Sequence, residues 1–195
     1  MIALIDYGAG NTASVANVLK DLNTDYIITQ KESEICKSDK IIFPGVGEAS
    51  YAIKKLNLYN LINLLRVIKK PFLGICLGMQ LMCERSEEGN VNCLGVFPTY
   101  CKKFEGDDIK IPHMGWNKVE FSEGSKLFDG IPNGQHFYFA HSYYVPVNVN
   151  TSSICNHGVD FTASMQKDNY YGVQFHPEKS GEYGINIIRN FLEKC

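Results

Sequence analysis

The sequence predicts an α/β fold: a central, mostly parallel sheet flanked by helices, with additional antiparallel strands in the second half. Two observations lead to this prediction. In the first half, short runs of continuous apolar residues alternate with segments of helical periodicity, as expected for strands buried on both faces of a parallel sheet. From about Val96 the pattern changes to short strand-like runs separated by turn residues, which indicates antiparallel strands.

The first half contains strand and helix candidates in alternation. The predicted strands are 2–7 (IALIDY), 25–30 (DYIITQ), 40–45 (KIIFPG) and 71–75 (PFLGI). The predicted helices run from a cap at Asn11 or Thr12 to about Leu22, from just after Gly47, and over 60–70 (NLINLLRVIKK). In such sheets the chemistry usually lies at the carboxyl ends of the strands. Three turns are expected there: Gly8-Ala9-Gly10, Pro44-Gly45-Val46-Gly47 and the turn at Cys76.

The second half contains shorter elements. Its strand candidates are 97–104, 117–121, 135–147, 152–158, 160–168 and 169–175, followed by a closing helix over 181–194. No linker, repeat or low-complexity tract separates the halves. A chain of 195 residues therefore reads as one domain, 1–195, in which the second half packs on the first.

The composition excludes several classes of protein. A hydrophobic content of 45%, a charged content of 21% and a net charge of −2 offer no general attraction for nucleic acid or an anionic membrane. No apolar run approaches the roughly 18–20 residues that span a bilayer, and the start lacks the features of a signal peptide. The seven cysteines form no CxxC pair, so we expect free thiols in the cytoplasm rather than a disulfide framework.

The segment Gly74-Ile75-Cys76-Leu77-Gly78 has the G-x-C-x-G pattern of a nucleophile elbow. An elbow places its nucleophile on a strained strand-to-helix turn, where flanking glycines allow close backbone contacts. The helix N-terminus favours a thiolate at Cys76, and the backbone N–H of Leu77 points to where an oxyanion forms. We therefore expect Cys76 to be a nucleophile. The alternative is a buried cysteine that only fills space.

A base and an orienting acid follow near the C-terminus, in His176-Pro177-Glu178. Residues two apart in an extended chain project to the same side, so the Glu178 carboxylate reaches one ring nitrogen of His176. The other nitrogen is then left for Cys76. The alternative is a surface His-Pro-Glu turn, but the presence of the elbow in the same chain favours the catalytic interpretation.

The other histidines and the second glycine turn complete the candidates. His113 and His141 either line the site or are structural, whereas His136 and His157 have no carboxylate at a useful spacing. No HxxxH or HExxH pair is present, so we expect neither a metal nor another cofactor. Pro44-Gly45-Val46-Gly47 lacks the lysine and length of a phosphate-binding loop. We expect it to present backbone N–H groups as the second half of an oxyanion hole, with a plain tight turn as the alternative.

In this order, Pro44-Gly-Val-Gly47, Gly74-Ile-Cys-Leu-Gly-Met-Gln80 and His176-Pro-Glu178 resemble the class I, triad-type glutamine amidotransferases. The resemblance extends essentially from Met1 to Cys195 and implies the flavodoxin-like sheet of that family. Four further stretches look like the glutaminase subunits of imidazole glycerol phosphate synthase, an enzyme of histidine biosynthesis: DYGAGN at 6–11, PHMGWN at 112–117, HSYY at 141–144 and GVQFHPEKSGEYG at 172–184.

The resemblance implies a role for each matching residue. Cys76 would attack the side-chain amide of glutamine, His176 would move the protons, and Glu178 would orient the imidazole. The oxyanion would be held by the Leu77 amide and by an amide of the Gly45-Val46-Gly47 turn. The resemblance also implies that this turn can require a reorientation before the oxyanion hole is complete. The positions that match glutamine-contacting residues are Gln80, Glu88, Ser142 and Tyr143, with Glu88 receiving the α-ammonium group.

The resemblance also implies a partner, a cyclase subunit with a (β/α)₈ barrel on a separate chain, which forms a heterodimer with the glutaminase. Asn11 and Trp116 match interface positions; for Trp116 the alternative is a place in the core. Two other functions stay open: a similar glutaminase that supplies ammonia for amidation of a surface-polysaccharide sugar precursor, and a catalytically silent binding module. A Cys-His peptidase would share the triad but not Gln80, PGVG and PHMGWN together.

Overall fold

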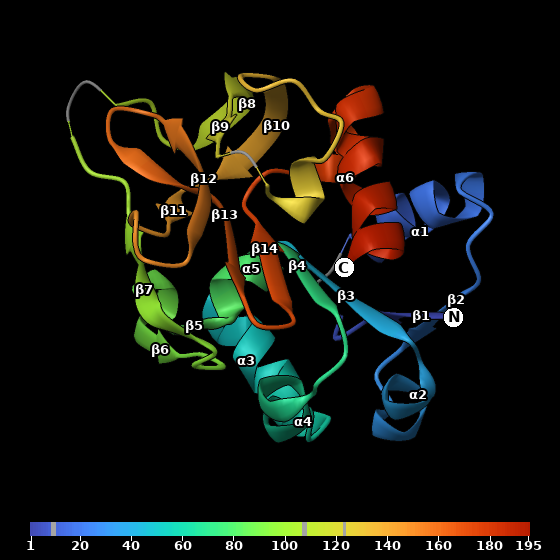
Figure 1. Ribbon diagram of the computed structural model, residues 1–195. Coiled ribbons are helices and arrows are strands. Elements are labelled where there is room, and N and C mark those ends of the chain that lie inside the picture. The colour runs from blue at the N-terminus through green and yellow to red at the C-terminus, as the bar shows by residue number, and fades with distance from the viewer. Residues whose placement is uncertain (9–10, 107–108, 123) are drawn as a thin grey trace.

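The computed structural model describes residues 1–8, 11–106, 109–122 and 124–195 (Figure 1). Its main sheet has eight strands in the order β2-β1-β3-β4-β14-β13-β12-β9. The first five of these run parallel, and β13, β12 and β9 each run antiparallel to their inner neighbour. The strands are β1 (Ile2–Ile5), β2 (Tyr26–Thr29), β3 (Lys40–Gly45), β4 (Phe72–Cys76), β9 (Glu120–Phe121), β12 (Thr151–Asn156), β13 (Asp160–Lys167) and β14 (Tyr170–Val173). The predicted fold class is confirmed.

Helices cover both faces of the parallel part of the sheet, because successive residues of each strand point to opposite sides. Ile5, Phe43 and Phe72 pack in one core with α2–α5, and Leu4, Ile42 and Leu73 pack in another with α1 and α6 (Figure 1). The helices are α1 (Thr12–Asp21), α2 (Glu32–Lys37), α3 (Ala49–Leu58), α4 (Ile62–Val67), α5 (Leu77–Leu81) and α6 (Gly181–Lys194). Three short 3₁₀ turns are η1 (Glu88–Asn90), η2 (Lys126–Phe128) and η3 (Pro177–Lys179).

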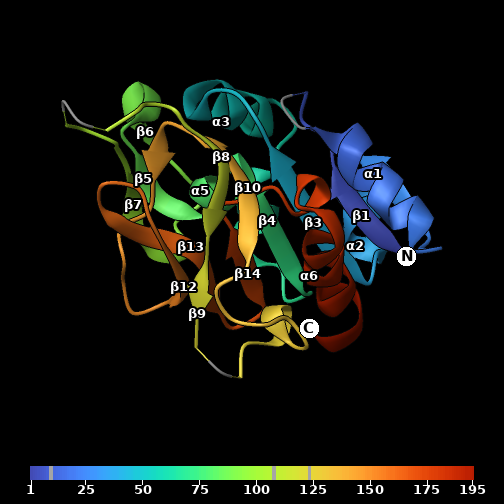
Figure 2. The ribbon, with the colours of Figure 1, turned by 90° about the horizontal axis from the view of Figure 1, so that it is seen from above.

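Two smaller sheets complete the second half. One has the order β11-β7-β5-β6, and the other is the antiparallel pair of β10 and β8, which packs through Phe137 and Phe139 on the α6 side of the main sheet (Figure 2). The strands are β5 (Cys83–Ser86), β6 (Val91–Asn92), β7 (Phe97–Lys103), β8 (His113–Lys118), β10 (His136–His141) and β11 (Tyr143–Tyr144).

The structure differs from the predicted elements in several places. Helix α2 was not predicted, because its six residues contain a single buried side chain, Ile35, and so show no helical periodicity. The run 135–147 is not one strand: β10 ends at His141, and β11 after it joins another sheet. Strand β8 begins at His113 rather than at Asn117. The pair β5 and β6 was also missed, since β5 buries only its two end residues and β6 has just two residues, so neither shows an apolar pattern.

Two expectations concern the chain around the first turn. Of the predicted Gly8-Ala9-Gly10 turn, Ala9 and Gly10 lie outside the described residues. Asn11 precedes α1 as predicted, but its side chain does not cap the helix backbone and instead accepts a hydrogen bond from the Ser14 hydroxyl at 3.0 Å. Throughout the described part of the chain, every helix is too short or too polar to cross a membrane.

Candidate active site

The predicted elbow is present, with Cys76 as the last residue of β4 and α5 starting at Leu77. Cys76 has φ 53° and ψ −112°, a conformation that costs a non-glycine residue about 1–3 kcal/mol and is typical of functional sites. The glycines on either side permit close backbone contacts. A Cβ added to Gly78 would lie 1.8 Å from the carbonyl oxygen of Phe43 in β3, and one added to Gly74 would lie 2.8 Å from the carbonyl group of Gly78.

The sheet brings the two distant halves of the predicted triad together. Strand β14 inserts next to β4 with Val173 opposite Ile75, so His176, three residues later, lies at the same edge as Cys76. The His176 Nδ1 atom is 2.8 Å from Glu178 Oε1, and both side chains are almost fully buried. Because an ionised carboxylate only accepts, Nδ1 carries the proton, and Nε2 is left for the thiol.

The environment of His176 favours the protonated ring. Burial lowers the pKa of His176, but a thiolate at Cys76 and the Glu178 carboxylate together outweigh it and raise that pKa to about 10. Glu178 Oε2 has no hydrogen-bond partner among the described residues, so the carboxylate directs its interactions through Oε1. The arrangement therefore supports an imidazolium beside the nucleophile at neutral pH.

The predicted glutamine-binding residues line one small cleft with Cys76. Its volume is about 80 Å³, and its lining includes Gln80, Glu88, Ser142 and Tyr143 together with Val46, Gly47 and Leu77. Gly45 does not line the cleft; it ends β3 opposite Cys76. The Gly45-Val46-Gly47 turn and the elbow at Cys76 thus lie side by side at the carboxyl edge of the sheet, as expected for neighbouring parallel strands.

Glu88 and Gln80 are held by neighbours in this cleft. Glu88 Oε2 accepts the backbone N–H of Ala49 at 2.9 Å; burial raises the pKa of Glu88, and this hydrogen bond opposes the shift. Gln80 Nε2 donates to Gln174 Oε1 at 2.9 Å and to the Tyr143 carbonyl at 2.8 Å.

Sequence reasoning missed two residues beside the nucleophile. Gln174 is fully buried, and its Nε2 lies 3.7 Å from Cys76 Sγ; the signal was its position two residues before His176, on the same side of an extended chain. Tyr7 is fully buried below Gly45, and its hydroxyl has no hydrogen-bond partner among the described residues. Burial, with smaller effects of Cys76 and Asp6, raises the pKa of Tyr7 far above its usual value.

The residues predicted to contact a partner, Asn11 and Trp116, do not line this cleft. Trp116 lies on β8 with 57% of its surface exposed, so it has no place in the core. Met114, on the same face of the same strand, is 65% exposed. An exposed tryptophan beside an exposed methionine is typical of a protein-binding surface.

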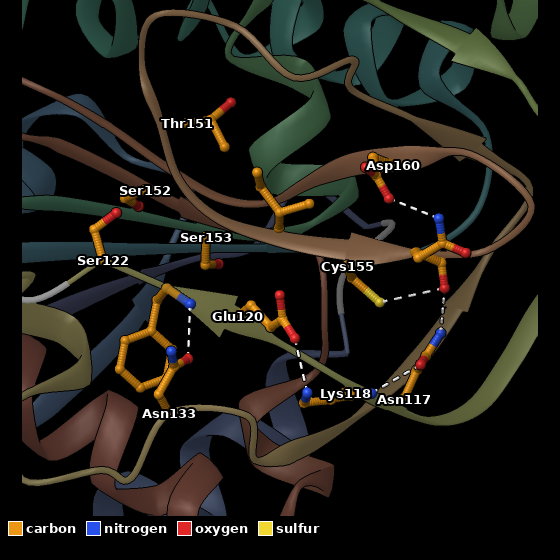
Figure 3. Close-up of a pocket in the computed structure, with 13 residues that line it drawn as sticks. Asn117, Lys118, Glu120, Ser122, Asn133, Thr151, Ser152, Ser153, Cys155 and Asp160 are labelled. Carbon is orange, nitrogen blue, oxygen red and sulfur yellow. Dashed lines mark hydrogen bonds and ion pairs between the residues drawn. The ribbon is translucent and has the colours of Figure 1, made fainter.

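A larger hollow of about 490 Å³ lies away from Cys76, between β8, β9 and β12 (Figure 3). The polar groups around it bond to one another: Lys118 to Glu120, Asn156 to Asp160, and Asn117 to the Asn156 carbonyl. It contains none of the predicted site residues. Within the described ranges, no group of three His, Cys, Asp or Glu side chains is placed to hold a metal ion.

Comparison with known proteins shows the family to which the chain belongs. The family model described as glutamine amidotransferase class-I matches residues 3–195. The chain is 45% identical over 193 residues to the imidazole glycerol phosphate synthase subunit HisH of Buchnera aphidicola subsp. Acyrthosiphon pisum, with 98% of each chain covered. It is 47% identical over 194 residues to the protein of the same name in Bacteroides fragilis, again covering 98% of each.

Solved structures show the same fold. A structure described as a glutamine amidotransferase superposes with a TM-score of 0.76 at 17% identity, covering 99% of this chain and 98% of that one. A putative GMP synthase protein from Thermoplasma acidophilum superposes with a TM-score of 0.74 at 22% identity, covering 98% and 91%. At these identities the similarity concerns the fold alone.

Proposed function

Because this chain belongs to the class I glutamine amidotransferase family, we propose that it is the glutaminase subunit of an imidazole glycerol phosphate synthase. It hydrolyses glutamine to glutamate and ammonia and passes the ammonia to a cyclase subunit in histidine biosynthesis. The observation behind this proposal is the Cys76–His176–Glu178 arrangement at the carboxyl edge of the sheet. The full-length similarity to proteins named HisH supports the choice of pathway.

In the first half of the reaction, Cys76 Sγ attacks the side-chain carbonyl carbon of glutamine. The C–S bond forms while the electron pair of the carbonyl moves onto oxygen, and the tetrahedral oxyanion then collapses with cleavage of the C–N bond. His176 gives its Nε2 proton to the departing nitrogen, so that ammonia leaves and a γ-glutamyl thioester stays on Cys76. His176 takes this proton from the Cys76 thiol, and the raised pKa of His176 favours its presence on the ring.

In the second half, water attacks the thioester. His176, now neutral, takes a proton from the water through Nε2, and the C–S bond breaks to release glutamate and the thiolate. Glu178 holds the ring throughout by accepting from Nδ1–H at 2.8 Å, which fixes the tautomer and stabilises the imidazolium when it forms. The cycle returns every atom of the site to its starting state without a cofactor.

The oxyanion binds to backbone N–H groups on two sides of Cys76. One belongs to Leu77 at the start of α5, and the other comes from the Gly45-Val46-Gly47 turn at the end of β3. One such donor is worth about 3–4 kcal/mol in the barrier, so the alignment of this turn decides whether the enzyme turns over. Gln80, Glu88, Ser142 and Tyr143 bind the rest of glutamine, with the Glu88 carboxylate receiving the α-ammonium group.

The ammonia requires a partner, because ammonia released into water is protonated and lost as a nucleophile. We assign this partner as a (β/α)₈-barrel cyclase subunit, with which the chain forms a heterodimer through the surface that carries Trp116 and Asn11. The exposure of Trp116 supports this assignment. The free state of all seven cysteines supports a cytoplasmic enzyme.

The test is glutamate release from glutamine by the purified chain, alone and with the histidine-pathway cyclase of the same organism plus its nucleotide substrate. We expect strong stimulation in the mixture and none with a Cys76→Ala variant that still binds the cyclase. Glutamate release by Cys76→Ala would overturn the mechanism. Absence of stimulation, with a cyclase that is active on free ammonia, would point instead to a glutaminase that serves amidation of a polysaccharide precursor.

A further inference from the structure

A continuous series of hydrogen bonds connects strand β8 to the nucleophile, and its bonds between the two histidines, between the two glutamines and from Gln174 to Cys76 are buried. It starts on β8, where Asn117 Nδ2 lies 3.1 Å from His113 Nε2. The same Nδ2 lies 2.8 Å from the Asn156 carbonyl (Figure 3). His113 Nδ1 lies 2.9 Å from His141 Nε2 in the neighbouring strand β10, where the two rings are direct cross-strand partners. His141 Nδ1 then lies 2.7 Å from the carbonyl oxygen of Tyr143.

The chemistry of the Tyr143 carbonyl sets the direction of every one of these hydrogen bonds. A carbonyl only accepts, so His141 donates through Nδ1–H, and in the neutral ring its Nε2 must accept. His113 therefore donates through Nδ1–H and accepts at Nε2, which is where the Asn117 amide donates. Each ring is thus held in one tautomer by the ring or carbonyl that follows it.

The same carbonyl is the meeting point with the glutamine cleft. Gln80 Nε2 donates to the Tyr143 carbonyl at 2.8 Å and to Gln174 Oε1 at 2.9 Å, which leaves Gln174 Nε2 facing Cys76 Sγ at 3.7 Å. The orientation of both amides follows from the Tyr143 carbonyl, since Gln80 Oε1 cannot face another acceptor. An N–H group is therefore presented to the sulfur that develops negative charge.

The environment of the two rings keeps them neutral. His113 and His141 pack among Phe104, Phe139 and Phe161. Burial, with smaller effects of neighbouring histidines, lowers the pKa of His113 to about 4 and that of His141 to about 3, although the bond to the Tyr143 carbonyl opposes the shift at His141. A charged His141 would place an Nε2–H against the Nδ1–H of His113 across 2.9 Å and break the series.

We propose that His141, oriented by His113, is a positioning residue of the glutaminase site: it holds the Tyr143 carbonyl and thereby keeps the Gln80–Gln174 amide pair aimed at Cys76. This proposal rests on the proposed function for its effect on turnover. Gln174 acts directly, because its amide touches the reacting sulfur. His113 acts through His141, from the strand β8 whose outer face carries Trp116. His141, at the end of β10, lines the cleft that contains Cys76 and acts on Gln80 and Gln174 through the Tyr143 carbonyl.

The experiment compares substitutions that keep or remove the donor at position 141. His141→Asn keeps an N–H in the place of Nδ1, whereas His141→Leu removes it. The double variant His113→Leu/His141→Leu also removes the His113 donor that the single variant leaves unpaired, and replacing both partners by apolar groups can be nearly neutral for stability. His136→Asn, at the exposed start of the same strand, is the matched control.

Two readouts separate positioning from folding. The first is kcat and KM for glutamate release in the presence of the cyclase. The second is the rate at which iodoacetamide alkylates Cys76, followed by mass spectrometry of the Cys76 peptide. Thermal unfolding of each variant identifies any that fail to fold. If His141→Leu fails to fold, the double variant tests the proposal in its place.

We expect His141→Leu and the double variant to lower kcat/KM about tenfold and to slow Cys76 alkylation, as for the loss of one hydrogen bond. The kcat/KM of His141→Asn should stay within about threefold of the wild-type value, as expected if only the N–H donor to the Tyr143 carbonyl matters. The proposal is overturned if folded Leu variants match the wild type in both readouts, or if Asn loses as much as Leu. Slower alkylation in a preparation whose wild type releases no glutamate supports the positioning role and overturns only the assigned function.

Discussion

Substitution of Gly78 by alanine tests the geometry of the elbow most directly. The new Cβ would lie 1.8 Å from the carbonyl oxygen of Phe43 and 2.9 Å from its carbonyl carbon. The new Cβ is fixed to the backbone of α5, and the carbonyl group belongs to the backbone of the central strand β3, so no side-chain rotation can relieve the contact. The two backbones must separate by about 1.6 Å to bring this contact from 1.8 Å to the 3.4 Å of ordinary van der Waals contact.

The cost of that separation can be bounded. Overpacking a core by an extra methyl group typically costs about 1–3 kcal/mol when neighbouring side chains adjust. Here the backbone itself has to move, so we expect a loss in unfolding free energy of about 3 kcal/mol, at the top of that range. The same movement displaces Cys76 and Leu77 relative to Gly45, and a displacement of about 1 Å at a reacting group can lower turnover about 100-fold.

Gly172→Ala provides the matched control in the adjacent strand β14. The three atoms nearest to its added Cβ belong to side chains: Met79 Cγ at 2.8 Å, and Met79 Cβ and Met82 Cε at 3.2 Å. The Cγ and Cε atoms can shift by rotation of these flexible side chains, and the Met79 Cβ contact needs only a few tenths of an ångström of relief. We expect a loss of about 1 kcal/mol and a small effect on turnover. Guanidinium unfolding and glutamate release with the cyclase measure both variants. Equal stabilities for the two variants, or full activity of Gly78→Ala, would refute the role assigned to this contact.

Three further predictions concern stability. The pKa values of His113 and His141 are lowered in the folded protein, so the unfolded chain binds more protons than the folded one below about pH 6.5. The stability that these neutral rings contribute is therefore present above about that pH, and it falls by about 2 kcal/mol per ring between pH 7 and pH 5. Urea unfolding should show this loss in the wild type but not in His113→Leu/His141→Leu. Tyr7→Phe should raise the unfolding free energy by about 1 kcal/mol, because it removes a buried hydroxyl that has no hydrogen-bond partner among the described residues; a decrease would indicate that the hydroxyl is bonded. Lys40 Nζ donates to the carbonyls of Phe191 and Leu192 at the end of α6 at 3.0 and 2.7 Å, so Lys40→Met should cost about 1–2 kcal/mol, and an unchanged Tm would contradict this.

The chemistry of the site and the nature of the first half could be predicted from local stretches of the sequence. The elbow at Cys76 is a local pattern, because its two glycines and its cysteine lie within five residues of one another. The pairing of His176 with Glu178 is also local, since side chains two residues apart meet on one side of an extended chain. The strands β1, β3 and β4 were predicted because strands buried on both faces consist of continuous apolar residues.

Which distant segments meet depends on packing of the whole chain. The sequence of residues 169–175 does not predict that β14 inserts beside β4. That insertion places His176 at the sheet edge where Cys76 lies. The split of 135–147 between two sheets likewise depends on which strands are available as partners. The bonds that join Gln174, Gln80 and the Tyr143 carbonyl cross 63 and 94 residues of chain. Periodicity reports which face of an element is buried, whereas the identity of the partner across that face is set by the tertiary structure.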